Sequence, residues 1–255
     1  MVAVMVTSAI RNARQSRQRC APVDSMIDLS AAYVIQASIF AEGDQPIAGW
    51  KIGLTGDAPR KSKGADAPAA GRLAGADILS SPALAPISTG DHYVEAELVV
   101  RFGTALPARD APFTSAQVAA AIDAVHVGIE LVTSRFAPDD LPLGLLIADN
   151  CMADRLVIGD KVSDGWENRF ADMAMTLNGP GKDRREGTTA AVMGDPLQAI
   201  TWLADWLAKN GLALEAGQWV SSGTCTGVKP VAAGDRVSAD FAGLGSATVE
   251  FTSES

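Results

Sequence analysis

The sequence has few of the residues that bind soft metals or form covalent cross-links. Its 255 residues include two histidines and three cysteines, Cys20, Cys151 and Cys225. An odd number of cysteines, far apart in the chain, is not typical of a disulfide framework or a zinc cluster. The sequence therefore indicates a reducing compartment, and we expect a cytoplasmic protein.

An excess of positive charge and long apolar runs are also lacking. Lysine and arginine total 21 against 30 aspartates and glutamates, which gives a net charge of −9. A nucleic-acid partner requires a basic surface, and an anionic membrane would repel so acidic a chain. No apolar run approaches the length of a membrane span. The composition therefore argues against nucleic-acid and membrane partners.

The N-terminus differs from the rest of the chain in its charge. The first twenty residues contain no acid but four arginines, Arg11, Arg14, Arg17 and Arg19. In a secretory signal the charge precedes the apolar part, whereas here the order is reversed. We interpret residues 1–25 as an N-terminal extension or first helix and residues 26–255 as the main domain. An arginine-rich organelle transit peptide is the alternative.

Three segments carry helix signals. Asp24 is placed to cap a helix that ends near Gly43, and Ser115 is placed to cap a short helix that leads into a strand. Asp195 and Pro196 stand at the N-cap and first turn of a longer amphipathic helix. Residues 57–75 have no period of either kind, which predicts a long loop of the sort that often forms lids or binding loops.

The remaining segments predict strands in the centre of the fold. The alternating or apolar runs fall at residues 93–102, 126–132, 218–224, 236–241 and 246–251. Few of these strands are joined by regular helices, so a doubly wound parallel sheet is not favoured. We predict a single α+β domain with a β-rich core and helices at its margins.

Two of the predicted strands carry glutamates on the face opposite their apolar side chains. Glu95 and Glu97 share one face of residues 93–102, and Glu130 lies on the corresponding face of residues 126–132. Three carboxylates with no cysteine nearby and few histidines suit a hard cation, Mg²⁺ or Mn²⁺. An E-x-E pair is a weak motif, so two simply solvated faces remain the alternative.

Lys51 is a second unusual residue because it lies between Trp50 and Ile52. Burial would lower its pKa unless an acid compensates. A lysine in this position can transfer protons or bind an anionic substrate, or it can reach solvent from a strand edge. A nucleophilic Cys225 would need a histidine base, and nothing in the sequence places one near it.

Taken together, eight segments resemble a known family. In chain order they read AAYVIQ, GWKIGLT, GRL, VEAEL, GIELVTSR, ADN, VMGDPLQAITWLADWLAKNGLALEAGQWVSSG and AGDRVSADFAGLGSATVEF. This order resembles the 2-keto-4-pentenoate hydratase and 4-oxalocrotonate decarboxylase family of the fumarylacetoacetate hydrolase superfamily, from about Tyr33 to Phe251. The resemblance implies a mixed β-roll with flanking helices, and it makes residues 26–255 a hydratase/decarboxylase-type catalytic domain.

The resemblance also assigns roles to individual residues. It makes Glu95, Glu97 and Glu130 the ligands of Mg²⁺ or Mn²⁺, and it makes Lys51 the active-site lysine. It places four residues at the substrate: Asp149, Asn150, Ser222 and Thr224. The partners it implies are a small 2-oxo or 2-hydroxy acid, further copies of the chain in a homo-oligomer, and a partner enzyme of aromatic catabolism.

The reaction implied is that of a metal-dependent lyase acting on a short 2-oxo or 2-hydroxydienoic acid. Water addition, as in the hydratases, is our first choice, and decarboxylation of a 2-oxo acid is the second. A C–C bond hydrolase of the acylpyruvate type would need a histidine–carboxylate pair, for which His92 is the candidate. A subunit that keeps the metal site without turnover is a further alternative.

Two positions depart from the family pattern. The family's loop usually reads Pro-Asp-aromatic-Gly, whereas this chain has Ala69 at the position of the aspartate. Asp66 is our candidate to replace that acid as a catalytic residue. After the third metal ligand the family usually has Asp-Ser-Arg, and here Thr133 takes the place of the aspartate. The outer half of the pocket, which selects substrate and reaction, is therefore expected to differ.

Overall fold

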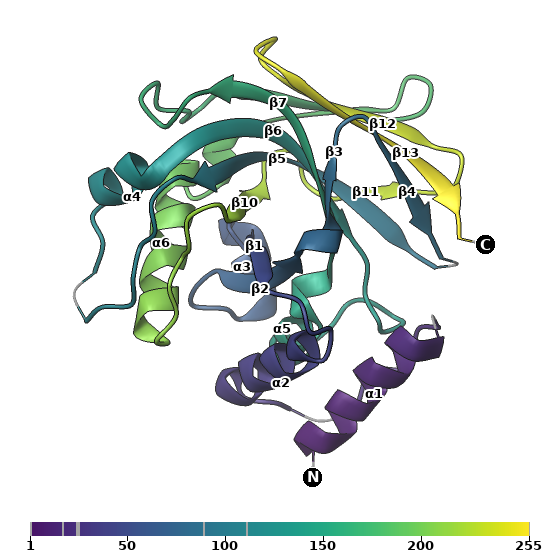
Figure 1. Cartoon of the computed structure of the whole chain (residues 1–255). Coiled ribbons are helices and arrows are strands. Elements are labelled where there is room, and N and C mark those ends of the chain that lie inside the picture. The colour runs from purple at the N-terminus through teal and green to yellow at the C-terminus, as the bar shows by residue number, and fades with distance from the viewer. Residues whose placement is uncertain (1, 17, 24–25, 89, 111, 255) are drawn as a thin grey trace.

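In the computed structural model, two β-sheets form the centre of the protein and helices lie at its margins (Figure 1). The structure describes residues 2–16, 18–23, 26–88, 90–110 and 112–254. The helices are α1 (Val2–Ser16), α2 (Leu29–Ala41), α3 (Asp57–Lys63), α4 (Ser115–Ala121), α5 (Leu143–Ala148) and α6 (Pro196–Lys209). The predicted α+β class is confirmed.

The larger sheet is mixed and carries the strands that matter for function. Its order is β2-β1-β10-β5-β6-β7-β3, and β11 pairs with β5. Strands β1 and β10 run parallel, whereas β5 and β6 form a long antiparallel pair at the centre. The bounds are β1 (Ile47–Gly53), β2 (Ala69–Ala74), β3 (Ile78–Ser80), β5 (His92–Phe102), β6 (Ile122–Val132), β7 (Ala153–Ser163), β10 (Trp219–Thr224) and β11 (Lys229–Val231).

The smaller sheet closes the structure into a roll. Its order is β4-β13-β12-β8-β9, with β4 (Ala83–Ile87), β8 (Ala174–Asn178), β9 (Arg184–Thr188), β12 (Arg236–Phe241) and β13 (Ser246–Ser253). Strands β12 and β13 lie against β6 and β7, and Figure 1 shows the long curved strands of the larger sheet arching beneath them. The predicted strands near the C-terminus are confirmed.

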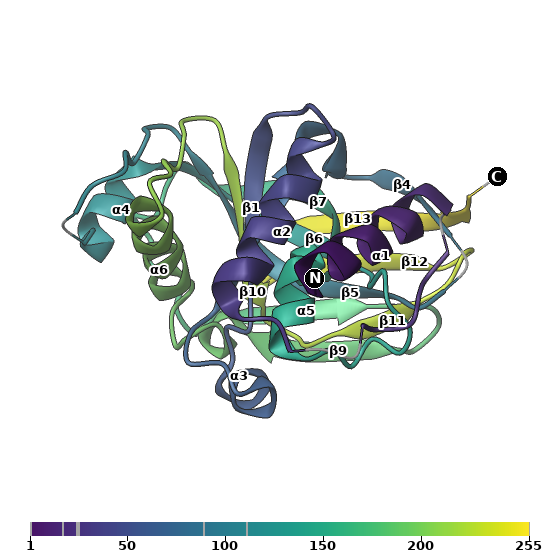
Figure 2. The same cartoon turned by 90° about the horizontal axis from the view of Figure 1, so that it is seen from below.

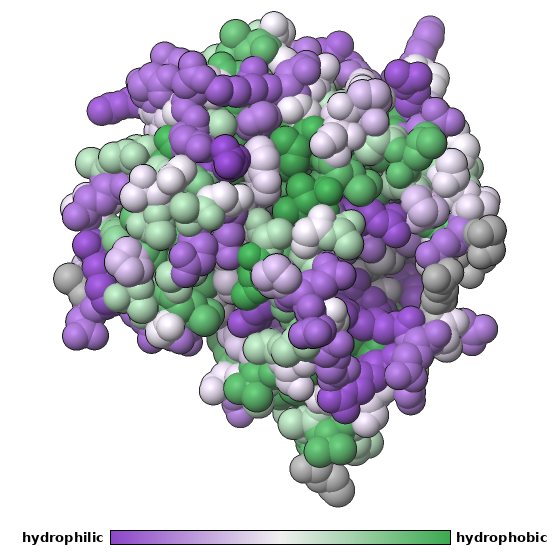
Figure 3. Space-filling model, viewed as in Figure 1, coloured by the Kyte–Doolittle hydropathy of each residue, from purple (hydrophilic) through white to green (hydrophobic). Residues whose placement is uncertain are grey.

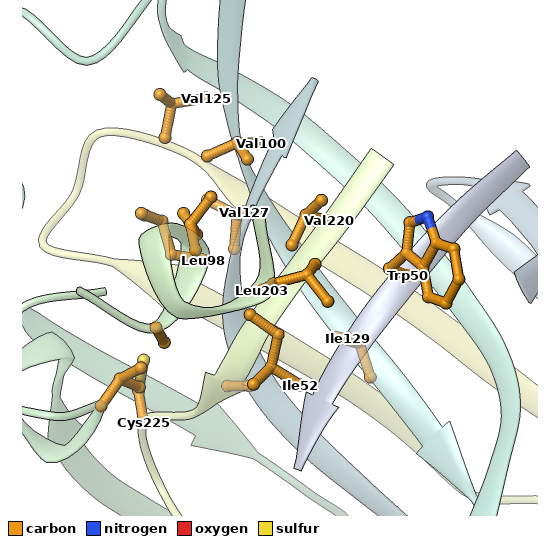
Figure 4. Packing of buried hydrophobic residues seen from close by; sticks show 14 of the residues in the cluster. Trp50, Ile52, Leu98, Val100, Val125, Val127, Ile129, Leu203, Val220 and Cys225 are labelled. Carbon is orange, nitrogen blue, oxygen red and sulfur yellow. The ribbon is translucent and has the colours of Figure 1, made fainter. Parts of the chain in front are cut away.

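The main core lies between the two sheets and under α6. The apolar face predicted for residues 93–102 is confirmed, because Val94, Leu98 and Phe102 are all completely buried. Figure 4 shows Leu203 of α6 pointing among the side chains of the larger sheet, near Val220. Burial of so many apolar side chains stabilises the fold at roughly 25 cal/mol for each Å² removed from water. This packing fixes the central strands as a rigid frame.

A second apolar cluster joins the N-terminal helices to the frame. Helices α1 and α2 pack together, and α2 packs on α5 (Figure 2). Val6 and Ile10 of α1 meet Ile35 and Ile39 of α2 in this cluster. The first helix is therefore docked through one face rather than frayed. The division of the chain after residue 25 stays a prediction.

Several boundaries differ from the prediction for identifiable reasons. The second helix begins at Leu29, because the carboxylate of Asp28 accepts the Ala31 N–H at 2.8 Å. The cap is therefore Asp28 and not the predicted Asp24, which lies outside the described residues. The fourth helix is capped by Thr114, whose side chain accepts the Gln117 N–H. By contrast, Asp195 caps α6 as predicted.

The expected long loop at residues 57–75 is wrong. It contains α3 and β2, and β2 pairs with β1 as an edge strand of the larger sheet. The small residues that obscured a strand pattern have a packing role. A Cβ on Gly71 would lie 2.9 Å from the side chain of Lys51, so this glycine leaves the room that the lysine occupies.

The surface carries polar side chains over most of the face seen in Figure 3, with apolar patches between them in its upper half. Within the described residues, the structure has no helix that is long and apolar enough to cross a membrane.

Candidate metal centre and active-site cavity

Three glutamates meet in the interior of the protein. The register of β5 and β6 sets Glu95 directly opposite Glu130 and sets Glu97 opposite Gly128. One carboxylate oxygen from each glutamate lies within 4.8 Å of those of the other two. Glu97 and Glu130 have no exposed surface, and Glu95 is 9% exposed. The alternative of two solvated strand faces is therefore wrong.

Strand β10 holds one of these carboxylates in place. Oε2 of Glu97 accepts hydrogen bonds from Ser221 Oγ at 2.5 Å and from the N–H of Gly223 at 2.7 Å. Gly223 has a φ of 115°, and a Cβ there would lie 2.4 Å from Thr55 Oγ1. Glycine is thus required to bring this backbone N–H to the carboxylate.

Lys51 of β1 reaches the same cluster. Its Nζ lies 3.1 Å from Glu130 Oε1 and donates to the carbonyl oxygen of Cys151, also at 3.1 Å. Burial opposes the charge on this lysine, but the carboxylates of Glu130 and Glu95 outweigh burial and raise the pKa of Lys51 above its ordinary value. Acids therefore compensate for burial, and Lys51 is a charged partner of the glutamates.

The carboxylates carry more negative charge than Lys51 can neutralise. Three ionised glutamates and one ammonium leave a formal charge of −2 in a buried site. Burial raises the pKa of Glu95 to about 7 despite the attraction of Lys51. Burial, together with repulsion by Glu130 and Glu95, raises the pKa of Glu97 well above its usual range. The protein alone thus holds these glutamates in an unfavourable state.

A divalent cation fits this arrangement. Among the described residues, nothing donates a hydrogen bond to Glu97 Oε1 or to Glu130 Oε2, although both atoms are buried. Such orphaned oxygens are costly unless a cation or water satisfies them. A cation with two positive charges would balance the cluster, and an all-oxygen ligand set suits Mg²⁺ or Mn²⁺. The residues present therefore fit a hard divalent metal.

A cavity of about 560 Å³ opens beside this cluster. Lys51, Glu95 and Thr224 line it near the carboxylates, and Tyr93 and Asp139 also line it. Most of the remaining wall consists of apolar or small side chains, such as Leu146 and Met152. The cavity offers polar groups at a few points and excludes water elsewhere, as binding sites for small organic ligands do.

The two residues predicted from the SSGT turn differ in position. Thr224 lines the cavity, whereas Ser222 is completely buried and does not line it. Oγ of Ser222 is buried and makes no hydrogen bond with a described residue, whereas the Thr224 side chain lies beside the carboxylate of Glu95 and interacts with it. Thr224 therefore lies at the carboxylate end of the cavity, and Ser222 is not part of the cavity wall.

Asp149 and Asn150 serve the architecture of the site. Asp149 Oδ1 accepts from Arg135 Nε at 2.5 Å, and Oδ2 accepts from Ser134 Oγ at 3.0 Å. The amide of Asn150 donates to the backbone oxygen of Arg72 and accepts its N–H, both at 2.8 Å. Neither residue is among those that line the cavity beside the glutamates. The structure therefore does not bring them to a ligand there.

The segment that contains them nevertheless supports Lys51. Asn150, Cys151 and Met152 all have positive φ, a strained conformation for residues other than glycine. This turn directs the Cys151 carbonyl oxygen towards Lys51. The ADN motif therefore contributes to the site through the backbone that follows it, which positions Lys51, rather than through its own side chains.

The structure does not bring Asp66 to the cavity. Asp66 is exposed and is not among the lining residues, whereas Ala69 is 1% exposed and does line the cavity. Thr133, the other departure from the family pattern, also lies off this cavity and donates its hydroxyl to the carbonyl oxygen of Asp91. The outer wall therefore lacks an acid at the position where the family usually has one.

Two alternative reactive groups are also placed away from the cavity. His92 Nε2 lies 3.0 Å from the carbonyl oxygen of Ser88, and His92 does not line the cavity. Cys225 is buried, and burial raises the pKa of its thiol. Neither residue is placed as a water-activating base or a nucleophile at this site.

Sequence reasoning missed Tyr93 and Asp139. Tyr93 shares the strand face of Glu95, so alternation could have found it. Asp139 lies in an irregular segment and reaches the cavity only through the fold, where it accepts a hydrogen bond from the Tyr93 hydroxyl at 2.8 Å. No local pattern marks it.

Comparisons with known proteins identify the family to which the chain belongs. The family model for fumarylacetoacetate (FAA) hydrolase, C-terminal, matches residues 69–252. The chain belongs to the fumarylacetoacetate hydrolase family. The family resemblance and the single-domain β-roll predicted from the sequence are thereby confirmed.

Individual relatives show which members of this family the chain resembles. The chain is 34% identical to the TodF product hydratase of Pseudomonas putida, over 90% of this chain and 88% of that protein. It is 30% identical to a 2-keto-4-pentenoate hydratase of Paraburkholderia phymatum, over 97% and 96% of the two chains. A solved 4-oxalocrotonate decarboxylase from Pseudomonas putida, complexed with magnesium and adipate, superposes with a TM-score of 0.89 at 26% identity, covering 98% of this chain and 97% of that one. The chain is thus similar to hydratases and to a decarboxylase that was solved with magnesium.

The contacts of Asp149 predict a role in stability rather than in substrate binding. Its side chain is 0% exposed and pairs with Arg135, which is 12% exposed. Asp149→Asn would leave that guanidinium without its counter-charge, so we expect a loss of roughly 3–5 kcal/mol in the free energy of unfolding, measured by denaturant titration. Asp164→Asn, in a surface pair with Lys161, should leave it nearly unchanged, because solvent screens an exposed ion pair. An unchanged stability with a raised KM would instead make Asp149 a substrate contact.

Proposed function

We propose that this protein is a divalent-metal-dependent lyase that adds water to a short 2-hydroxydienoic acid by way of its 2-oxo tautomer. The observation that carries the proposal is the buried cluster of Glu95, Glu97 and Glu130, with its excess negative charge, beside a mostly apolar cavity. The hydratases among its relatives support the same reaction.

In this proposal the three glutamates hold Mg²⁺ or Mn²⁺. When bound, the cation would supply positive charge to the carboxylate and C2 oxygen of the acid, which favours the enol form. The solved decarboxylase with magnesium and fumarylpyruvate hydrolase with Mn²⁺ support a divalent metal in this fold. Ser221 and Gly223 orient Glu97, so that its free oxygen points away from β10.

Lys51 acts beside the glutamates. Its ammonium lies at the cavity wall, within reach of an acid that enters there. It can hold the C2 oxygen or transfer the proton that moves when enol and ketone interconvert. Thr224 lines the cavity beside Glu95, so its hydroxyl is placed to hydrogen-bond the same end of the substrate.

We propose hydration rather than decarboxylation because of the part of the cavity wall that lies around Asp139. Its wall is largely apolar, and Asp139 there would repel a second carboxylate. Decarboxylation remains the second candidate, since the solved decarboxylase covers almost the whole chain. A C–C hydrolase is not favoured, because His92 lies off the cavity.

The assembly and location are part of the proposal. Val4 and Met5 of α1 and Val34 of α2 are exposed apolar side chains on neighbouring helices, 69%, 52% and 66% exposed. A homo-oligomer would cover such side chains. The unpaired cysteines support a cytoplasmic location, and the hydratase relatives support a place in aromatic catabolism.

The metal site predicts a cation-dependent gain in stability. Binding to the native state raises the unfolding free energy by about 2.7 kcal/mol when the ion is at 100 times its Kd. We expect Mg²⁺ or Mn²⁺ to raise the melting temperature of the wild type. Glu97→Gln should abolish most of that rise, and the three Glu→Gln changes should not be additive, because the residues act as one unit.

Glu250→Gln provides the matched control, since Glu250 is a strand glutamate that faces solvent. It should keep the full rise in melting temperature. A wild type that binds no divalent ion by elemental analysis, with no change in melting temperature, contradicts the metal site.

The reaction is tested with a panel of 2-hydroxydienoic and 2-oxo acids. We expect loss of the dienol chromophore with formation of the 4-hydroxy-2-oxo acid for a five- or six-carbon substrate with an uncharged tail. Release of CO₂ from a dicarboxylic 2-oxo acid at a higher kcat/KM would favour the decarboxylase. If the metal-loaded protein turns over no member of the panel, the protein is a non-catalytic subunit.

Lys51 predicts a separation of binding from turnover. We expect Lys51→Met, which keeps the length of the side chain, to retain the cation-dependent rise in melting temperature. Its kcat should fall on the order of 10²–10⁴-fold, as for the loss of a general acid–base group. A raised KM with an unchanged kcat would make Lys51 an anchor for the substrate carboxylate instead.

A further inference from the structure

Water addition at C4 needs a group that takes a proton from the water, and the expected acid is missing from the cavity wall. Ala69 lines the cavity at the position where the family usually has an aspartate, and Asp66 is exposed and lies off the wall. Among the described residues that line the cavity, the acids are Glu95 and Asp139. Glu95 belongs to the carboxylate cluster, so Asp139 is the acid that remains.

We propose that Asp139 is the catalytic base of hydration and that Tyr93 and Arg19 are its positioning residues. This inference rests on the proposed function, because it assigns the second step of that reaction. The Tyr93 hydroxyl donates to Asp139 Oδ2 at 2.8 Å, and Arg19 Nη2 lies 3.8 Å from the same oxygen. No described residue donates to Oδ1, which leaves that oxygen for a water.

Tyr93 lies between the glutamate cluster and Asp139, because it neighbours Glu95 along one face of β5 and its hydroxyl contacts Asp139. Tyr93 and Glu95 share one face of β5, and both line the cavity. The rise of a strand separates their Cα atoms by about 7 Å. An acid held through its C1 and C2 oxygens at the glutamates extends C4 about 2.5 Å beyond C2, over two carbon–carbon bonds. In the proposal, the water that adds to C4 is bound at Oδ1 of Asp139, which lines the same cavity.

Arg19 brings the N-terminal segment into contact with Asp139. Its Nε donates to the carbonyl oxygen of Phe136 at 2.8 Å, and its Nη1 donates to Asp91 at 2.6 Å. The side chain is 15% exposed, so its charge is held close to Asp139 with little screening by solvent. Arg19 and the Tyr93 hydroxyl thus fix the position of one oxygen of Asp139, which holds the carboxylate at the cavity wall.

Lys63 also lines the cavity, but its charge is engaged elsewhere. Its Nζ donates to Asp140 at 2.5 Å and to the carbonyl oxygen of Leu141 at 2.8 Å. Asp140 is 93% exposed, although it is the neighbour of Asp139 in the chain. The two adjacent aspartates therefore differ in surroundings, and only Asp139 of this pair lines the cavity.

In the proposed reaction the dienol is first converted to its 2-oxo tautomer and then hydrated. The dienol loses its C2 hydroxyl proton and gains a proton at C5, which gives a 2-oxo acid with a double bond between C3 and C4. The water oxygen then forms a bond to C4 while one of its O–H bonds breaks, and Asp139 takes that proton. The π electrons of the C3–C4 bond move to the enolate. Protonation at C3 gives the 4-hydroxy-2-oxo acid, and Asp139 releases its proton to solvent.

The test compares hydration with a reaction that uses only the carboxylate end of the site. Deuterium exchange at C3 of a saturated five-carbon 2-oxo acid requires enolisation but offers no double bond to hydrate. We expect Asp139→Asn to lower the kcat of dienol hydration on the order of 10²–10⁴-fold and to leave the exchange rate within a few-fold of wild type. Tyr93→Phe should lower hydration less, with exchange again retained.

Asp140→Asn and Asp66→Asn are the matched controls, and both should hydrate at the wild-type rate. The cation-dependent rise in melting temperature reports that each variant is folded and keeps the glutamate cluster. If Asp139→Asn hydrates as fast as wild type, or if Asp66→Asn alone loses hydration, Asp139 is not the base and the inference is overturned. A wild type that catalyses neither exchange nor hydration contradicts the proposed function itself.

Discussion

The repulsion among three buried carboxylates is the constraint around which this fold is arranged. Glu95, Glu97 and Glu130 place three negative charges where water cannot separate them. Each neighbouring element relieves part of the cost: β10 donates two hydrogen bonds to Glu97, and β1 supplies the ammonium of Lys51. The charge that remains selects for a divalent cation, because a neutral ligand would leave the repulsion in place.

The sheet register decides whether that arrangement can form. Glu95 stands opposite Glu130, and Gly128 stands opposite Glu97. A Cβ on Gly128 would lie 2.3 Å from Val99 Cγ2, so a larger residue would force the strands apart. A slip of one residue between β5 and β6 would turn the glutamates into the apolar core. The core packing of Leu98 and Ile129 on the opposite face therefore keeps the three glutamates together.

Alternation along the strands predicted the shared face of the glutamates, because that property is local. Burial of the polar face was not predictable from local alternation, since residues of other segments, Leu146 of α5 with Cys151 and Met152, line the cavity beside the glutamates. For Asp149 the sequence identified an important residue but not its partner, Arg135. Asp66 was predicted to replace the missing acid because it lies close to Ala69 in the chain. Ala69 belongs to the edge strand β2 and is buried, whereas Asp66 precedes this strand and is exposed.

The two ends of the cavity are built from different parts of the chain. The carboxylate end uses β1, β5, β6 and β10, which share one rigid sheet and its core. The other end depends on an irregular segment around Asp139, held by Tyr93 and by Arg19 from the N-terminal residues. A rigid frame suits the chemistry that the relatives have in common, whereas irregular segments tolerate substitution. The carboxylate end can therefore be kept while the other end changes, and a fold divided in this way can serve both the hydratases and the decarboxylases that the chain resembles.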